Sequence, residues 1–425
     1  MSRVVNDEPT RRRRERGGTR EYPGAAVKNG WPTKTLDQVC EIINGGTPKT
    51  GVREYWDGNH LWITPAEMGK RLSPHVSDTE RKITDLGLRN SSARMLPPNS
   101  VILSSRAPIG HLVINTEPMA TNQGCKGLIP GSQLQHKFLY YYLSSIVDLL
   151  NLLGTGATFK ELSGGKLKEV TIPLPPLPEQ QRIVGILDET FEGIAAAKTN
   201  AEKNLQNARA LFESHLQSVF TQHGPGWVEK PLGSFASFRN GINYTKDSKG
   251  ERVKIVGVRN FQKHFSAPLD NLDTVTIDGQ LSELDSLRQD DILTVRSNGN
   301  IELIGRCILV GEVTERLSHS GFTIRIRLSN GEVLPRYVCH FMKSASSRKL
   351  LTEGGTGTNI KSLNQGILSA LAIPFPPISV QKVLVEKLKS LSEETQRLAS
   401  LYERKLAALE ELKKSLLHQA FTGQI

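Results

Sequence analysis

GTGATFKEL (154–162) and IPLPPLPEQ (172–180) are the two stretches that decide the fold. Both return 201 residues later, as GTGTNIKSL (355–363) and IPFPPISVQ (373–381), and the alignment needs no gap from the first stretch to residue 222. Roughly a third of the aligned pairs are identical, and a constant offset over such a length is typical of an internal repeat. The chain is therefore predicted to hold two copies of one unit, each a variable globular segment followed by a similar tail.

The tail of each copy is predicted to be a long helix that begins after the prolines, near Pro178 and Pro377, with Ser379 as a candidate N-cap. Apolar or small residues then recur with the 4,3 spacing of a coiled-coil seam. The first stripe is Ile183, Leu187, Thr190, Ile194, Ala197, Ala201, Leu205, Ala208, Leu211 and Val219. The second is Leu384, Leu388, Leu391, Leu398, Tyr402, Leu409, Leu412 and Leu416. A helix of about 40 residues is ~60 Å long, and a single stripe on it requires a partner. We expect the two helices to pair antiparallel, about a pseudo-twofold axis, and to act as a spacer.

The globular segments combine short β-type runs, such as SVILSSR at 100–106 and GFTIRIRL at 321–328, with helical stretches at 136–153 and 334–353. The predicted fold class is α+β: two similar mixed α/β domains and two long helices in an antiparallel coiled coil. The predicted boundaries are 1–29 for a basic disordered tail, 30–175 for the first domain, 176–225 for the central helix, 226–376 for the second domain and 377–425 for the C-terminal helix.

Composition favours a nucleic-acid partner. The net charge is +11, and residues 1–30, with eight Lys or Arg against four Asp or Glu, account for +4 of it, which leaves +7 for the body. The four cysteines are far apart, and neither a secretion signal nor an apolar run long enough to span a membrane is present. A reduced, cytoplasmic location is therefore expected.

Enzyme motifs are missing from the sequence. We find no P-loop, no G-x-S-x-G, no H-E-x-x-H and no N-P-P-[FY] of an amino-methyltransferase. The histidines, including His111 and His319, are scattered and could belong to the core or the surface as easily as to a site. We therefore expect no catalytic residue, no metal site and no cofactor bound by this chain.

Arg106 and Arg296 both follow a β-type run and precede a turn, so they are expected at equivalent positions in the two copies. One interpretation is an exposed arginine at a strand end. The other is a DNA contact, because a planar guanidinium can bind phosphate or guanine through two hydrogen bonds. The polar turn after Arg296 favours the second interpretation, and it contains Ser297, Asn298 and Asn300.

The glycine-rich loops of the repeat also hold candidate contacts, because such loops can bind phosphate through backbone N–H groups. Helix-capping turns are the alternative for these loops. Amide and ammonium groups suited to DNA lie there and in the run NQGCK. The candidates are Asn122, Gln123, Lys126, Lys160, Thr358 and Lys361.

The layout resembles the specificity subunit of type I restriction–modification enzymes over about residues 30–425. The two I-P-[LF]-P-P segments that lead into long helices carry the resemblance, together with the half-repeat. NGGTPKT (44–50), YWDGNHLWITPAEM (55–68) and NQGCKGLIP (122–130) resemble the first target-recognition domain of that family. NGINYTKDSKG (240–250) departs from it, because the G-G-T-P run is missing.

The resemblance implies that each globular segment is a target-recognition domain that reads one half of a bipartite, asymmetric site in double-stranded DNA, with Thr47 among the contacts. It implies partners as well: two modification subunits, which bind S-adenosylmethionine and methylate adenine, and a restriction subunit, which uses ATP and Mg. The residues expected to dock the modification subunits are Pro175, Pro176, Gln180, Pro376, Pro377 and Gln381.

Two other interpretations compete with that of a DNA reader. A coiled-coil scaffold that binds only proteins would leave the basic body unexplained. A fragment of a fused restriction–modification enzyme would be expected to carry methyltransferase or ATPase motifs. Salt-dependent binding to duplex DNA distinguishes a reader from a scaffold.

Overall fold

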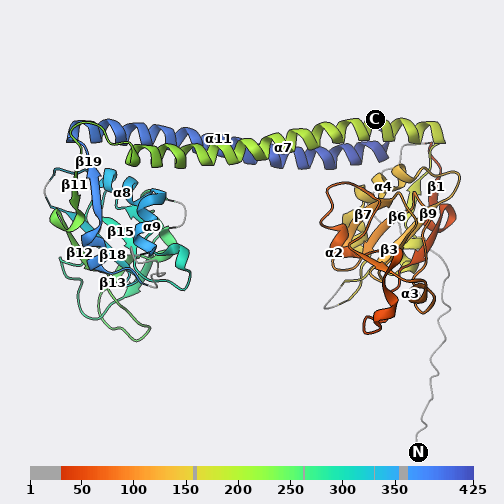
Figure 1. Cartoon of the computed structure of the whole chain (residues 1–425), viewed down its shortest axis with the longest axis horizontal. Helices are drawn as coiled ribbons and strands as arrows, with labels where there is room; N and C mark the ends of the chain where they lie inside the picture. The colour runs from red at the N-terminus through yellow and green to blue at the C-terminus, as the bar shows by residue number, and fades with distance from the viewer. Residues whose placement is uncertain (1–29, 157–159, 262–263, 330, 354–361) are drawn as a thin grey trace, which may run out of the picture. The chain divides into compact units, whose positions relative to one another are not determined.

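A computed structural model describes residues 30–156, 160–261, 264–329, 331–353 and 362–425. The chain divides into two compact units, unit 1 with residues 1–198 and 407–425 and unit 2 with residues 199–406. The basic tail 1–29 and most of the second glycine-rich loop, 354–361, lie outside the described residues. Two helices of 45 residues, α7 (Leu177–Thr221) and α11 (Ile378–Thr422), each contribute one end to unit 1 and the other end to unit 2 (Figure 1).

Unit 1 contains two sheets and a helical layer. The larger sheet has the order β2 (Cys40–Asn44), β9 (Cys125–Pro130), β6 (Val101–Ser105), β7 (Ile109–Asn115), β4 (His75–Val76). The smaller has the order β5 (Arg81–Ile83), β3 (Trp56–Ile63), β8 (Met119–Thr121), and β1 (Thr33–Thr35) pairs with β10 (Thr171–Pro173). The helices are α1 (Leu36–Val39), η1 (Arg53–Tyr55), α2 (Pro65–Met68), α3 (Asp85–Arg89), α4 (His136–Ser145), α5 (Val147–Leu153) and α6 (Gly164–Lys168).

Unit 2 is built in the same way. Its larger sheet has the order β12 (Ala236–Asn240), β18 (Thr323–Leu328), β15 (Ile292–Val295), β16 (Cys307–Leu309). Its smaller sheet has the order β14 (Asp273–Thr276), β13 (Arg252–Val256), β17 (Leu317–His319), and β11 (Val228–Pro231) pairs with β19 (Ala372–Phe375). The helices are η2 (Leu232–Ser234), η3 (Val258–Phe261), η4 (Ile301–Leu303), α8 (Pro335–Lys343), α9 (Ala345–Glu353) and α10 (Gln365–Ala370).

The central strand of each larger sheet is covered on both faces, which explains its continuous apolar run. In unit 1, Val101 and Leu103 of β6 join the core beneath α4, whereas Ile102 between them packs toward the smaller sheet. In unit 2, Ile292 of β15 packs beneath α8 and Leu293 toward the smaller sheet. The two units therefore share one topology except at the sheet edge, where β4 of unit 1 has no counterpart among the described strands of unit 2. Their sequences nevertheless match only near the repeat stretches. The predicted α+β fold with two similar domains is confirmed.

The long helices pair antiparallel within each unit, as predicted. In unit 1, Arg182 donates to the carbonyl of Ile425 (2.9 Å) and Lys198 forms an ion pair with Glu410 (2.6 Å), so partner numbers fall along α11 as they rise along α7. In unit 2, Arg209 forms an ion pair with Glu403 (2.7 Å).

A phenylalanine near the end of each long helix completes the aromatic core of one unit. Phe421 of α11 packs edge-on against Phe138 and Tyr142 of α4, with ring centroids 5.1 and 5.2 Å away. Phe220 of α7, its equivalent in the repeat, packs in the same way at 5.3 Å from both Tyr337 and Phe341 of α8. Each domain is thus covered by the start of the helix that follows it and by the end of the other helix.

Several details differ from the prediction. Leu211, Leu398 and Leu412 of the predicted stripes are exposed, because the pairing of two helices covers only one side of each. α11 begins at Ile378, so Ser379 lies in its first turn and is not the N-cap. Each predicted helical stretch of the globular segments is two helices: α4 and α5 meet at Ile146, and α8 and α9 meet at Ser344. No described helix is long and apolar enough to cross a membrane.

Replacing Gly185 or Gly193 by alanine is expected to stabilise unit 1. Both glycines are exposed in the interior of α7, and a Cβ atom added at either position would meet nothing within 4 Å. Alanine restricts the unfolded chain and favours helix, so each substitution should raise the free energy of unfolding by about 0.4–1 kcal/mol. Urea denaturation of the single and double variants measures this, and a loss of stability would contradict it.

Candidate nucleic-acid interface

The glycine pair in NGGTPKT allows the loop after β2 to pack tightly against its neighbours. A Cβ atom at Gly45 would overlap the carbonyl oxygen of Asn122, and one at Gly46 would overlap the backbone of Ala93. The amide of Gly46 donates to the carbonyl of Thr121 (2.9 Å). Glycine is required for so close an approach of two backbones, and the result is that Thr47 lies against the loop that follows β8.

Three of the predicted DNA contacts meet at this point. The Thr47 hydroxyl donates to the amide oxygen of Gln123, and the Asn122 amide nitrogen donates to the Thr47 oxygen (3.1 Å). The amide oxygen of Asn122 also accepts from the backbone of Gly124 (2.7 Å), which fixes the turn. Gln123 is exposed, so the cluster presents amide and hydroxyl groups to solvent.

Arg106 and Lys126 lie beside these residues. A Cβ atom at Gly124 would be 3.2 Å from Cγ of Arg106, and Nη1 of Arg106 is 3.8 Å from Oε2 of Glu161. Burial lowers the pKa of Lys126, the nearby Arg106 lowers it further, and Glu161 opposes both. We name Thr47, Arg106, Asn122, Gln123 and Lys126 the unit 1 polar cluster. Lys160 is exposed and precedes Glu161 in the chain.

The candidates in unit 2 line the turn after β15. Asn298 accepts a hydrogen bond from the amide of Asn300 (2.9 Å), and Asn300 caps η4 by accepting from the amide of Glu302 (3.0 Å). Both asparagines are exposed, whereas Arg296 and Ser297 are half-buried. Their amide oxygens each accept one hydrogen bond that shapes the turn, and their amide nitrogens can donate to DNA. Thr358 and Lys361 fall outside the described residues.

The predicted equivalence of Arg106 and Arg296 is wrong by one residue. Arg296 donates its amide to Phe322 and accepts from the amide of Leu363, and Ser105 makes the matching bonds with Gly124 and Leu162. Arg296 therefore corresponds to Ser105, and Arg106 to Ser297. A shift of one residue along a strand reverses the face of the sheet, so the two arginines leave their strands on opposite sides.

His319 belongs to the core, one of the interpretations that the sequence allows. It is 1% exposed, its Nδ1 lies 2.9 Å from the Thr323 hydroxyl, and burial lowers its pKa to about 3. Arg327 on β18 forms a bidentate ion pair with the buried Asp291, with both N–O distances 2.7 Å. This ion pair could not be predicted from the sequence, because GFTIRIRL has the pattern of an ordinary half-exposed strand.

The chain matches the family model described as the type I restriction modification DNA specificity domain twice, over residues 28–206 and 226–404. The chain belongs to this family. The MjaIX specificity subunit of Methanocaldococcus jannaschii is 31% identical over 250 residues, which are 55% of this chain and 58% of the relative. The StySPI specificity subunit of Salmonella potsdam is 23% identical over 427 residues, which are 94% of this chain and 90% of the relative.

Solved structures share the specificity-subunit fold. A chain from a structural study of complex assembly in a type I R-M system matches with a TM-score of 0.74 at 17% identity, covering 94% of this chain and 99% of that one. The HsdS subunit of Thermoanaerobacter tengcongensis matches with a TM-score of 0.60 at 16% identity, covering 94% and 98%. The family resemblance drawn from the sequence is confirmed.

The six predicted docking residues lie in the two proline segments, at equivalent positions of the repeat. Gln180 is fully buried, and its side chain bonds the backbones of Gln133, Gln135 and Pro175 at 2.8–2.9 Å. Gln381 repeats this with the backbones of Glu332, Leu334 and Pro376 at 2.9 Å. Pro175 and Pro376 are buried, whereas Pro176 and Pro377 are exposed. The glutamines thus fix the shape of the segment from inside and offer no side-chain surface to a partner.

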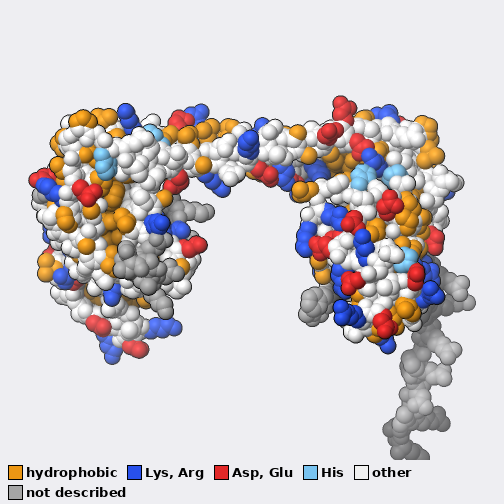
Figure 2. All heavy atoms as spheres, viewed as in Figure 1, with side chains coloured by type: hydrophobic (Ala, Val, Ile, Leu, Met, Phe, Trp, Pro, Cys, Tyr) orange, Lys and Arg blue, Asp and Glu red, His pale blue; other side chains and the backbone are white. Residues whose placement is uncertain are grey.

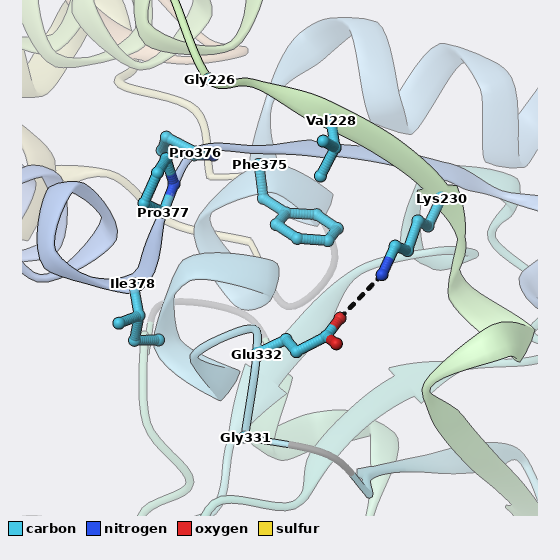
Figure 3. A pocket seen from close by; sticks show the side chains of 9 residues that line it. All are labelled: Gly226, Val228, Lys230, Gly331, Glu332, Phe375, Pro376, Pro377 and Ile378. Atoms are coloured by element: carbon cyan, nitrogen blue, oxygen red, sulfur yellow. Dashed lines mark hydrogen bonds and ion pairs between the residues drawn. The ribbon is translucent and has the colours of Figure 1, made fainter.

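An apolar groove opens beside the second of these segments. It has a volume of about 490 Å³, and Figure 3 shows Phe375 facing into it between Val228 and the ion pair of Lys230 with Glu332 (2.9 Å). Pro377 and Ile378, where α11 begins, line its other side.

Proposed function

We propose that this chain directs a type I restriction–modification complex to a bipartite, asymmetric DNA site, each globular part reading one half. The observation that carries the proposal is the duplicated topology with divergent loops. In unit 1 the polar residues Thr47, Asn122 and Gln123 follow β2 and β8, whereas in unit 2 Arg296 and a polar turn follow β15, the equivalent of β6. One scaffold with two different polar loop sets suits a protein that reads two different short sequences.

Catalysis in the proposed complex belongs to other subunits. Modification subunits would bind S-adenosylmethionine and methylate adenine, and a restriction subunit would supply the ATP- and Mg-dependent steps. Among the described residues, no group of three or more His, Cys, Asp or Glu side chains could hold a metal ion. The four cysteines are free and buried, which suits a reducing cytoplasm.

Two modification subunits are proposed to dock at the two proline segments. The segments have the same internal hydrogen bonds, so two identical partners would meet similar surfaces. The exposed prolines Pro176 and Pro377 and the apolar groove beside Pro377 offer contact area. Leu398 and Leu412, which face solvent on α11, add to it.

The function is tested by mapping adenine methylation in cells that carry this chain with its partner subunits. We expect methylation at one two-part sequence with a fixed gap, and its disappearance when this chain is deleted. A protein-only scaffold would leave the sequence preference intact in the deletion strain. Methylation at a continuous, unsplit sequence would contradict the two-reader proposal.

Arg106→Ala and Arg296→Ala are each expected to weaken binding to the mapped sequence by about 1–3 kcal/mol, the cost of one bidentate contact. Because the two arginines belong to different units, each loss should be confined to a different half-site. Competition binding with duplexes altered in one half-site at a time measures this. Unchanged affinity and unchanged preference in both variants would remove these arginines from the interface.

A further inference from the structure

An arginine outside the unit 1 polar cluster is held by two tryptophans. The guanidinium carbon of Arg81 lies 3.8 Å from the ring centroid of Trp56 and 5.3 Å from that of Trp62. The two indole rings meet edge-on at 5.1 Å and are 8% and 1% exposed, so they form a rigid platform. Arg81 pairs directly with Trp62 across β5 and β3, which places both side chains on one face of the smaller sheet.

The platform is attached to the same loop that carries the polar cluster. The indole N–H of Trp62 donates to the carbonyl of Gly46 (2.9 Å), and that of Trp56 donates to the carbonyl of Lys49 (3.3 Å). Thr47, between these two carbonyls, bonds Gln123 of the polar cluster. Arg81 and the polar cluster therefore border the loop 44–50 together.

Arg81 is exposed, and no carboxylate lies within ion-pair distance of it in the described part of the chain. Basic and acidic side chains alternate on the face of unit 1 seen in Figure 2. Three other cations near it in sequence form ion pairs: Lys70 with Glu80, Arg71 with Glu67 and Lys82 with Asp78. A guanidinium stacked on a ring keeps its N–H edge free and loses little freedom when that edge binds.

We infer that Arg81 is a DNA contact of unit 1, donating two parallel hydrogen bonds to a pair of acceptors on the duplex. The acceptors are either N7 and O6 of a guanine or two oxygens of one phosphate, since both match the planar fork. The inference rests on the proposed function and extends the reading surface of unit 1 across the loop 44–50. The tryptophans are positioning residues that fix the direction of the guanidinium.

Arg81→Ala in the full chain, purified with its partner subunits, tests the inference. The unaltered complex first selects a sequence from a pool of duplex DNA with randomised sequence. Binding of each variant to that selected sequence is then measured. We expect about 10-fold weaker binding or more to the selected sequence. Loss of one G·C preference in one half-site identifies the guanine edge as the acceptor. If affinity falls equally for every DNA sequence, and the salt dependence of binding falls by about one phosphate contact, the acceptor is a phosphate.

Two further variants separate this contact from bulk charge and from misfolding. Lys82→Ala removes the same charge from the neighbouring residue, whose side chain points to the opposite face of β5, and should bind as the unaltered chain does. Arg81→Lys keeps the charge without the planar fork, and should bind more weakly to the selected sequence while melting at the same temperature. Equal binding by Arg81→Ala and Lys82→Ala would overturn the inference. If the unaltered complex selects no sequence from the pool, both the proposed function and the inference about Arg81 are wrong.

Discussion

Phe421→Ala is expected to lower the free energy of unfolding of unit 1 by about 3–5 kcal/mol, and Phe220→Ala to do the same to unit 2. Both rings are almost fully buried, at 2% and 4% exposure, and each packs edge-on between two aromatic residues of a core helix. Alanine would leave a cavity at the junction of helix and sheet layer, which the surrounding rings could fill only in part.

Hydrogen exchange resolved by residue is the appropriate measurement, because a chain of two units need not unfold in one step. Phe421→Ala should reduce amide protection in α4 and leave α8 unchanged, and Phe220→Ala should do the reverse. Leu412→Ala and Leu211→Ala are matched controls, since they shorten exposed leucines on the same two helices and should cost less than about 0.5 kcal/mol. An equal loss of protection in both units would refute this division of the core.

Gln180→Leu is expected to destabilise unit 1 by about 3 kcal/mol or more. The buried side chain bonds three backbone groups: the buried carbonyl of Pro175, and the partly buried N–H of Gln135 and carbonyl of Gln133. Each buried group left without a partner costs about 1–3 kcal/mol, and leucine can bond none of them. Gln381→Leu should have the same effect on unit 2, through Leu334, Glu332 and Pro376.

Gln181→Leu is the matched control, because the neighbouring glutamine is exposed on α7 and its replacement should change stability by less than about 0.5 kcal/mol. Urea denaturation followed by circular dichroism compares the two variants. Similar stabilities of Gln180→Leu and Gln181→Leu would show that the buried hydrogen bonds contribute little.

The long helices and the proline segments were predictable because their signals are local and repeated. A 4,3 stripe, prolines at the helix start and an offset of 201 residues all lie within short windows of sequence. The shared topology of the two globular segments was only partly predictable. A strand that is buried on both faces requires only apolar residues, and many different apolar sequences meet that requirement. β6 and β15 therefore occupy equivalent positions in the two sheets although their residues do not match.

The candidate interface was harder to predict, since its residues come from separate segments that meet only through strand pairing. From the sequence, Arg106 and Arg296 were predicted to be equivalent because each follows a β-type run. The backbone hydrogen bonds show instead that Arg296 is equivalent to Ser105. The stack of Arg81 on Trp56 depends on the pairing of β3 with β5, which includes a bulge. Two tryptophans six residues apart, shortly before the basic run Arg81–Lys82, are the sign of it in the sequence.

The placement of Phe421 also has a consequence for the order in which the protein matures during translation. Unit 1 needs residues 407–425, which the ribosome adds only after it has made all of unit 2. Unit 2 is continuous from 199 to 406, so its core can close while α11 is still emerging. The first domain to be synthesised is then the last to be finished, and until that moment Phe138 and Tyr142 lack the ring of Phe421 that packs on them. A nascent chain stalled before residue 407 would be the form most exposed to chaperones and proteases.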